Sequence, residues 1–164
     1  MKYKISSTLS FSIILLFGCG GNEPTHSSES DSHEHHVHVA PHGGQLIEVG
    51  EHGSGFNLEL VHHFDGFLQI YILDAHAENF VRIGGDFIEL TMPGENNTVD
   101  RIICEAIPDP VTGETVGNTS LFTSTERITD ILPLQAMIPR LSILDYTFEN
   151  IEVNFSGNSE KSPE

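Results

Sequence analysis

From residue 45 to residue 155 the sequence is a succession of short apolar runs that end at glycine, proline or Asp-Gly turns. In the run Phe56–His62 apolar and polar residues alternate, which is typical of a strand with one solvated face. Asp65 and Gly66 separate this run from a second one, Phe67–Leu73. An Asp-Gly pair between two such runs favours a tight hairpin. A repeat of two residues predicts strands rather than helices.

The remaining runs extend this pattern to the end of the chain. Strands are predicted at Gln45–Val49 and at residues 80–83, 87–92, 98–107, 120–124, 135–143 and 146–155. Residues 129–139 are ambiguous, with a helical turn near residues 130–134, and Pro139 indicates an edge position or a bulge. Eight or nine short strands with turns between them favour an all-β fold, an antiparallel β-sandwich of immunoglobulin-like type over residues 40–155. Residues 156–164 are a polar tail.

The N-terminus has the pattern of a bacterial lipoprotein signal peptide over residues 1–18. Lys2 and Lys4 give a positive start, and a short apolar run ends in Leu16-Phe17-Gly18-Cys19. The run is too short to span a bilayer comfortably. Its end resembles a lipobox, which implies cleavage before Cys19 and lipidation of that sulfur. We therefore expect a cell-envelope protein, periplasmic or at the outer membrane or surface, tethered to a membrane from outside the cytoplasm. An ordinary secretory signal or an uncleaved anchor are the alternatives.

The chain is strongly acidic. It has 24 Asp and Glu against seven Lys and Arg, a formal charge of -17. Loss of residues 1–18 would remove Lys2 and Lys4 and no acidic residue, which leaves five basic residues and a charge of -19. Such a surface repels nucleic acid and attracts cations, so a DNA or RNA partner is not expected.

Residues 19–39 are predicted to be a flexible, histidine-rich tether. They contain Gly, Ser, Glu, Asp and His and few bulky apolar residues, so burial cannot offset the entropy of ordering them. The tract at the end of the tether places four imidazoles close together in sequence, at His33, His35, His36 and His38. Neutral imidazole is a good ligand for zinc and copper, and we expect these side chains to bind such an ion. The alternative is a polar spacer with inert histidines.

All ten histidines lie at or before His76, and five of them fall between residues 42 and 76. If Phe56–His62 and Phe67–Leu73 form a hairpin, His62 and His63 lie near its turn. Asp74 and His76 then lie at its other end, roughly 20 Å away. The glycine-rich turn at residues 50–55 enters at that same end. We therefore predict His52 and His76 as partners in a metal site, with Asp74 as a carboxylate helper and His42 as a third imidazole.

No sequence pattern indicates an enzyme. The chain has no G-x-S-x-G, no H-E-x-x-H and no phosphate-binding glycine loop. Cys104 lies in an alternating run, where a single cysteine is usually a small buried hydrophobe. A hydrolase of unrecognised type is the weakest hypothesis, and a non-enzymatic interaction or structural module of the cell envelope with incidental histidines is the main alternative to metal binding.

Three segments carry a resemblance to a known family: Pro41-His42-Gly43-Gly44-Gln45, Leu58-Glu59-Leu60-Val61 and Tyr71-Ile72-Leu73-Asp74. Together, over residues 41–83, they resemble the small N-terminal metal-associated segment of periplasmic adaptor subunits of heavy-metal efflux systems, and related bacterial lipoproteins. The resemblance implies His42 as a ligand, Asp74 at the matching strand end, and a metal efflux system as a partner.

Beyond the resembling segment the chain departs from those adaptors. No coiled-coil hairpin, lipoyl-like domain or barrel domain of an adaptor is recognisable, and methionine-rich copper(I) motifs are missing. A bridge between a pump and a channel is therefore not expected. The sequence favours a free-standing lipoprotein that binds zinc or copper(II) for sequestration, buffering or hand-over in metal homeostasis.

Overall fold

A computed structural model describes residues 38–157 of the 164-residue chain. The predicted signal peptide, Cys19 with its predicted lipidation, and the histidines at 33, 35 and 36 lie outside the described residues, as do residues 158–164. The described part begins at His38, the last histidine of the predicted tether.

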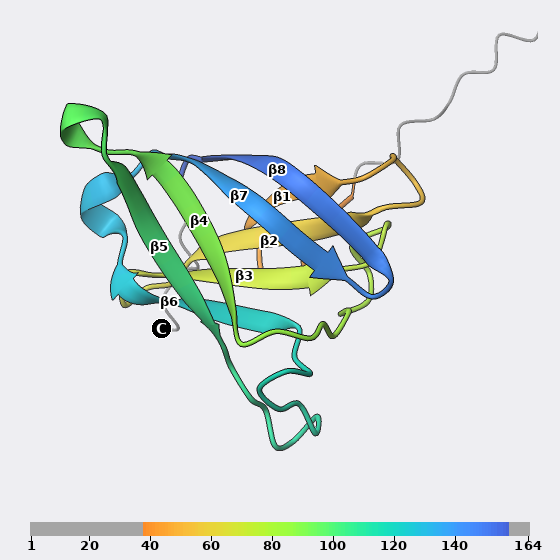
Figure 1. The fold of residues 1–164 in the computed structure, drawn as a ribbon. Helices are drawn as coiled ribbons and strands as arrows, with labels where there is room; N and C mark the ends of the chain where they lie inside the picture. Colours follow the sequence, from red (N-terminus) through yellow and green to blue (C-terminus); the bar gives the residue numbers. More distant parts are fainter. Residues whose placement is uncertain (1–37, 158–164) are drawn as a thin grey trace, which may run out of the picture. The chain divides into compact units, whose positions relative to one another are not determined.

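The described residues form eight antiparallel strands and two short 3-10 helices (Figure 1). The elements are β1 (Gln45–Val49), β2 (Phe56–His62), β3 (Phe67–Leu73), β4 (Phe87–Pro93), η1 (Glu95–Asn97), β5 (Val99–Ala106), β6 (Leu121–Arg127), η2 (Thr129–Ile131), β7 (Leu134–Ile143) and β8 (Tyr146–Phe155). The all-β prediction is confirmed, and strand ends agree with the sequence pattern to within three residues. The predicted strand at residues 80–83 forms only isolated bridges, at Phe80 and Ile83. Within residues 38–157 no helix has the length and apolar character needed to cross a membrane.

The eight strands belong to one sheet, where the sequence predicted a sandwich of two. Their order is β1-β2-β3-β6-β5-β4-β7-β8, and every neighbouring pair is antiparallel. In Figure 1 the β7–β8 hairpin crosses in front of β1 and β2, because the sheet curls back over itself. A strongly twisted sheet of this size curls until its two ends approach, and the result is a nearly closed, barrel-like sheet.

Two weak seams interrupt this closure. At one, Gln45 on β1 bonds through its side-chain amide to the Asn154 carbonyl oxygen and to the Ser156 N–H at the end of β8. At the other, β4 and β7 share a single register pair, Thr91 and Met137. The backbone ladder is therefore replaced by side-chain contacts at the first seam and nearly absent at the second.

The core lies inside the curled sheet and is built by the alternating residues of the strands, and β1 contributes the buried Val49 with Ile47 packed against it. Cys104 is among these residues and is fully buried, as predicted. Pro139 is not on an edge strand, because β7 lies between β4 and β8. Instead, the buried positions of β7 change parity there, from Leu134 and Ile138 to Leu141 and Ile143. Asn150, opposite on β8, has a φ of 56°, so both strands twist at this point.

Strand β2 is buried on both faces, which the alternating pattern did not predict. Leu58 and Leu60 face the core, but Asn57, Glu59 and Val61 on the opposite face are also buried. Two segments cover this outer face. Backbone carbonyls of the loop after β3 accept hydrogen bonds from Asn57, and residues 42–44 pack against Glu59 and Val61.

Candidate metal-binding site

Three imidazole rings gather where the chain enters the sheet. The ring of His38 lies 5.8 Å from that of His52 and 5.7 Å from that of His76, measured between centroids. His38 is also fixed by a hydrogen bond of 3.1 Å between its Nδ1 and the His76 carbonyl oxygen. The structure therefore places the rings of His52 and His76 next to the ring of His38, at the end of the predicted tether.

Glu48 joins this group from the end of β1. Its Oε1 lies 2.9 Å from Nδ1 of His52, which stands four residues later on the glycine-rich turn. One candidate ligand atom from each of His38, Glu48 and His52 lies within 4.8 Å of the other two. The side chains of Glu48 and His52 are half exposed, at 50% and 54%. The group is therefore an open surface site that an ion can reach from solvent.

Asp74 builds the loop that carries His76. Its carboxylate accepts hydrogen bonds from the backbone N–H groups of His76 and Glu78 and from the side-chain amide of Asn79. Partial burial of the carboxyl group opposes ionisation, but these hydrogen bonds outweigh it and hold the pKa of Asp74 below its ordinary value. This arrangement uses Asp74 to shape the loop, and it is not one of the three clustered ligands.

His42 lies outside the cluster, in a contact of its own. Its Nδ1 is 2.9 Å from Oε2 of Glu59, whose side chain is fully buried. The backbone N–H groups of His42 and Gly44 both donate to Oε1 of the same carboxylate, at 2.7 and 3.0 Å. The imidazole also stacks on the Tyr71 ring, with 3.9 Å between centroids. The Pro-His-Gly-Gly segment is therefore fastened to the outer face of β2.

Gly44 explains why a second glycine is needed in this motif. A Cβ at Gly44 would come within 2.5 Å of the Leu60 carbonyl oxygen and 2.7 Å of Val61. The segment reaches Glu59 only because residue 44 has no side chain. Gly43 has open space around it but a φ of 68°, which also favours glycine.

His62 and His63 lie at the other end of β2, as the hairpin prediction requires. His62 Nε2 is 3.1 Å from the Thr129 hydroxyl, and His63 Nδ1 is 2.6 Å from Asp65. They have different faces and different partners. The structure therefore does not bring them to the cluster around His38.

Sequence reasoning missed two acidic residues that organise these contacts, Glu48 and Glu59. The spacing of Glu48 and His52 across a glycine turn was an available signal. Glu59 was assigned to a solvated face, because alternation alone cannot show that another segment covers that face.

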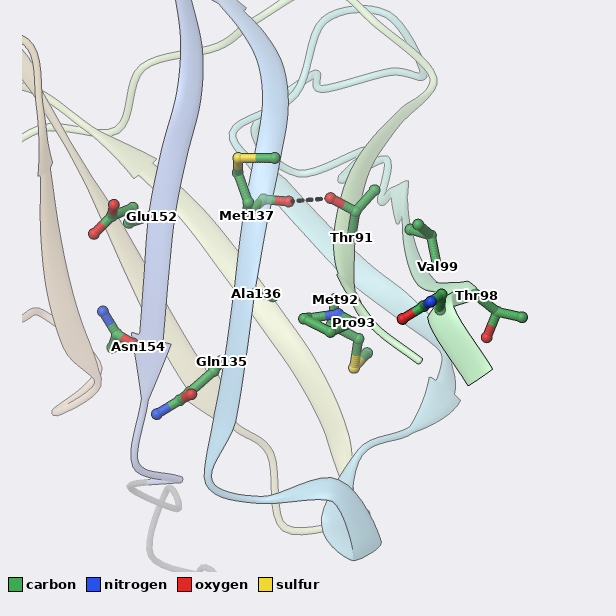
Figure 2. A pocket seen from close by; sticks show the side chains of 11 residues that line it. Thr91, Met92, Pro93, Thr98, Val99, Gln135, Ala136, Met137, Glu152 and Asn154 are labelled. Atoms are coloured by element: carbon green, nitrogen blue, oxygen red, sulfur yellow. Dashed lines mark hydrogen bonds between the residues drawn. The ribbon is translucent and has the colours of Figure 1, made fainter. Parts of the chain in front are cut away.

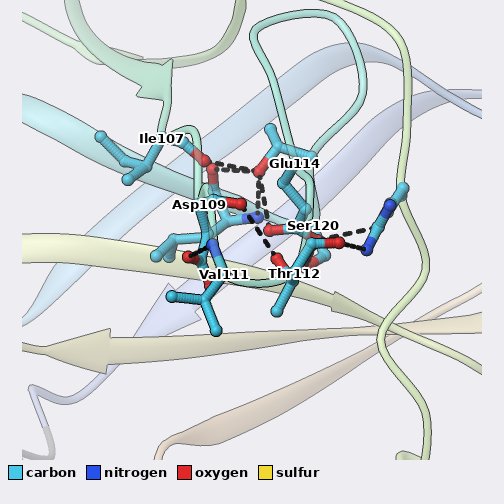
Figure 3. Close-up of polar contacts among 9 residues, drawn as sticks. Ile107, Asp109, Val111, Thr112, Glu114 and Ser120 are labelled. Atoms are coloured by element: carbon cyan, nitrogen blue, oxygen red, sulfur yellow. Dashed lines mark hydrogen bonds and ion pairs between the residues drawn. The ribbon is translucent and has the colours of Figure 1, made fainter.

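A polar network in the loop before β6 is internally satisfied (Figure 3). Glu114 pairs with the Arg82 guanidinium at 3.2 Å and accepts a hydrogen bond from the Ser120 hydroxyl at 2.8 Å. The Arg82 side chain also donates to the Thr112 carbonyl oxygen. No imidazole belongs to this network among the described residues, and the Glu114 carboxylate that accepts the Ser120 hydrogen bond is already paired with the Arg82 guanidinium. The network closes the loop and does not resemble a nucleophilic site.

A groove of about 650 Å³ opens at the seam between β4 and β7 (Figure 2). Its walls are mainly apolar, with Met92, Val99 and Met137 prominent, and Glu152 is its one acidic side chain. The sheet is unpaired there beyond Thr91 and Met137, which join through the Thr91 hydroxyl and the Met137 carbonyl oxygen. This groove offers shape and apolar surface but no set of titratable groups for catalysis.

Comparison with protein-family models, curated proteins and solved structures finds no match for this chain. The functional conclusion therefore depends on the geometry of the residues described above.

Proposed function

We propose that this protein is a lipid-anchored, extracytoplasmic protein that binds a divalent transition metal ion, zinc or copper(II), through histidines. The observation that carries the proposal is the group formed by His38, Glu48 and His52, whose ligand atoms lie within 4.8 Å of one another. Two imidazoles and one carboxylate are a recurrent ligand set for zinc. The anchor at Cys19 and the extracytoplasmic location come from the sequence pattern.

The hydrogen bonds of both rings support this ligand role. A carboxylate or a carbonyl oxygen only accepts, so Nδ1 of His52 must donate to Glu48, and Nδ1 of His38 must donate to the His76 carbonyl. In a neutral imidazole this places the lone pair of His38 on Nε2, the nitrogen that would bind the ion, whereas His52 Nδ1 and Glu48 would exchange the hydrogen bond between them for bonds to the ion and release a proton. Metal-binding histidines are commonly oriented by such a bond from their other nitrogen.

The spacing fits an ion after small side-chain movements. A tetrahedral zinc ion with bonds of about 2.1 Å separates its ligand atoms by about 3.4 Å. The three atoms therefore need to approach by at most about 1.4 Å, which rotation of exposed side chains supplies. His76, whose ring adjoins His38, is positioned to add a further imidazole.

Charge and position support a role in sequestration, buffering or hand-over. The formal charge of -17 attracts cations to the whole surface. The histidines at 33, 35 and 36 precede His38 by two to five residues in sequence, and we propose that they deliver ions to the cluster or add ligands. A metal efflux system is the proposed partner, on the resemblance of residues 41–83 alone.

The test is a zinc titration of the full chain against a chromophoric chelator. We expect the double variant His38→Ala/His52→Ala to bind zinc more than about tenfold more weakly, because even residues that only orient a ligand contribute roughly 10–100-fold to affinity. His62→Ala is the matched control, since it removes an imidazole at the opposite end of β2. Equal affinity of the double variant and the wild type would refute the folded site.

The alternative is an interaction module of the cell envelope that binds no metal. The apolar groove at the β4–β7 seam favours it, because solvent-exposed apolar grooves often receive a partner. A wild-type chain that binds neither zinc nor copper(II) would support this alternative.

A further inference from the structure

Asn57 has a buried acceptor atom that no described residue satisfies. Its side chain is 2% exposed. The Nδ2 group donates to the carbonyl oxygens of Asp74 and Ala75, both at 3.0 Å. The Oδ1 atom receives no hydrogen bond within residues 38–157. Rotation of the amide by 180° would set Oδ1 against two carbonyl oxygens, so the orientation is determined by its surroundings. A buried amide oxygen without a donor is costly, and it needs an explanation.

Asn57 stands next to the candidate metal site. Asn57 stands directly opposite Glu48 on β1 and opposite Leu73 on β3. Its Nδ2 reaches the loop that comes after β3, and the two ends of an amide point in different directions. Directly opposed residues of neighbouring strands share a face of the sheet, so the Asn57 amide lies beside the Glu48 side chain of the cluster. Asn57, Glu48 and His52 line one small cavity, together with Glu51 and Ala75.

This cavity is too narrow for a water molecule. A water oxygen lies about 2.8 Å from the acceptor that it bonds. A zinc ion lies only about 2.0–2.2 Å from an oxygen ligand. A bare cation therefore needs less space beside Oδ1 than a water molecule does.

We propose that Asn57 Oδ1 is a buried oxygen ligand of the metal ion held by His38, His52 and Glu48. The inference rests on the metal-binding function proposed above, and it specifies the ligand set as two imidazole nitrogens and two oxygens. This set suits zinc and copper(II). It does not suit copper(I), which prefers sulfur ligands, or magnesium, which prefers six oxygens and retains its waters.

The same amide links the ion to the loop that orients His38. Nδ2 of Asn57 holds the carbonyls of Asp74 and Ala75, and the next residue, His76, accepts the bond from His38 through its own carbonyl oxygen. A cation on Oδ1 polarises the amide and strengthens the hydrogen bonds that its N–H groups donate. Metal binding should therefore tighten the loop at residues 74–76.

The experiment monitors the Asn57 side chain by NMR in the isotope-labelled full chain during titration with zinc chloride. The Asn57 13Cγ and 15Nδ2 resonances, assigned by their loss in Asn57→Ser, should shift in step with binding measured by the chelator competition. The side-chain resonances of Asn97, in η1 between β4 and β5, serve as the control and should stay in place. Zinc binding that leaves the Asn57 resonances unmoved would overturn the ligand assignment while the metal-binding function stands. A wild-type chain that binds no zinc overturns both.

A pair of variants gives a second readout. Asn57→Ser should weaken zinc binding by about tenfold or more, in the range found for residues that support a metal site. Asn79→Ser is the matched control, because Asn79 also donates an amide hydrogen bond to Asp74 but does not line the cavity. Equal losses in both variants would show that Asn57 acts only through the loop, and would refute the ligand role.

Discussion

The contact between Glu59 and the Pro-His-Gly-Gly segment allows a quantitative test of the structure. Glu59→Leu removes a fully buried carboxylate that accepts hydrogen bonds from His42 N, His42 Nδ1 and Gly44 N. A buried group that loses its hydrogen-bond partner costs about 1–3 kcal/mol, so with three donors left behind, of which the His42 ring is partly exposed, we expect a loss of about 3–5 kcal/mol. Glu59→Gln keeps an oxygen for the two backbone donors and loses the charge, so we expect about 1–2 kcal/mol.

The measurement is urea denaturation monitored by circular dichroism. For a folded part of about 120 residues, each kcal/mol corresponds to about 4 °C in Tm, so Glu59→Leu should also melt roughly 12–20 °C earlier. Glu89→Leu is the control, because Glu89 lies on the surface in an ion pair with the exposed Arg101 and should cost at most about 1 kcal/mol. A Glu59→Leu loss no larger than that of Glu89→Leu would refute the role assigned to the buried carboxylate.

Three further outcomes test other parts of the structure. Gly44→Ala should lower the free energy of unfolding, measured by urea denaturation, by more than about 2 kcal/mol, because the added Cβ overlaps β2. Gly43→Ala has no such overlap and should cost only the roughly 1–2 kcal/mol of a left-handed backbone conformation. Equal losses in the two variants would contradict the close approach of residue 44 to β2. Burial raises the pKa of the Cys104 thiol to about 12, so a disulfide reagent should modify this thiol only as fast as the protein unfolds. Rapid labelling of Cys104 in the native protein would contradict its burial in the core. The hydrogen bond from His63 lowers the pKa of Asp65 below its ordinary value of 3.8. The stability that this hydrogen bond contributes is therefore present above pH 3.8 and is lost as the pH falls through the lowered pKa of Asp65. Between about pH 5 and pH 3 the free energy of unfolding should fall less in Asp65→Asn than in the wild type, which denaturation at each pH measures.

The strands were predictable because their signal is local. Alternation and turn residues place β1, β2, β3 and β8 at the observed bounds, and Asp65-Gly66 marks the hairpin between β2 and β3. The hairpin also separated His62 and His63 from His76 without any tertiary information. Local pattern could not decide between two sheets and one, because that choice depends on how the seam strands meet, and here Gln45 meets the end of β8 far along the chain.

The candidate site divides in the same way. The sequence placed His52 and His76 at the same end of the hairpin, because strand length and turn position fix which ends they occupy, and in the structure both rings adjoin His38. It did not foresee the contact of His42 with Glu59 or the hydrogen bonds of Asp74 within its own loop, for a physical reason. A histidine or a carboxylate has the same sequence pattern whether it binds an ion or satisfies a neighbouring backbone group.

By itself, the sequence determined a β fold, the position of its turns, an acidic surface and a cluster of histidines near the first strands. These result from the side-chain period, from glycine and Asp-Gly geometry and from charge, all of which act over a few residues or over the chain as a whole. Only the tertiary structure decided that β2 is covered on both faces, that Glu59 fastens His42, and that Glu48 and Asn57 stand beside the His38 cluster. Hydrogen bonds fasten the covering segments to β2. They join Glu59 to His42, and Asn57 to Asp74 and Ala75, which lie 17 or 18 positions away in sequence. Packing between segments distant in sequence brings these residues together.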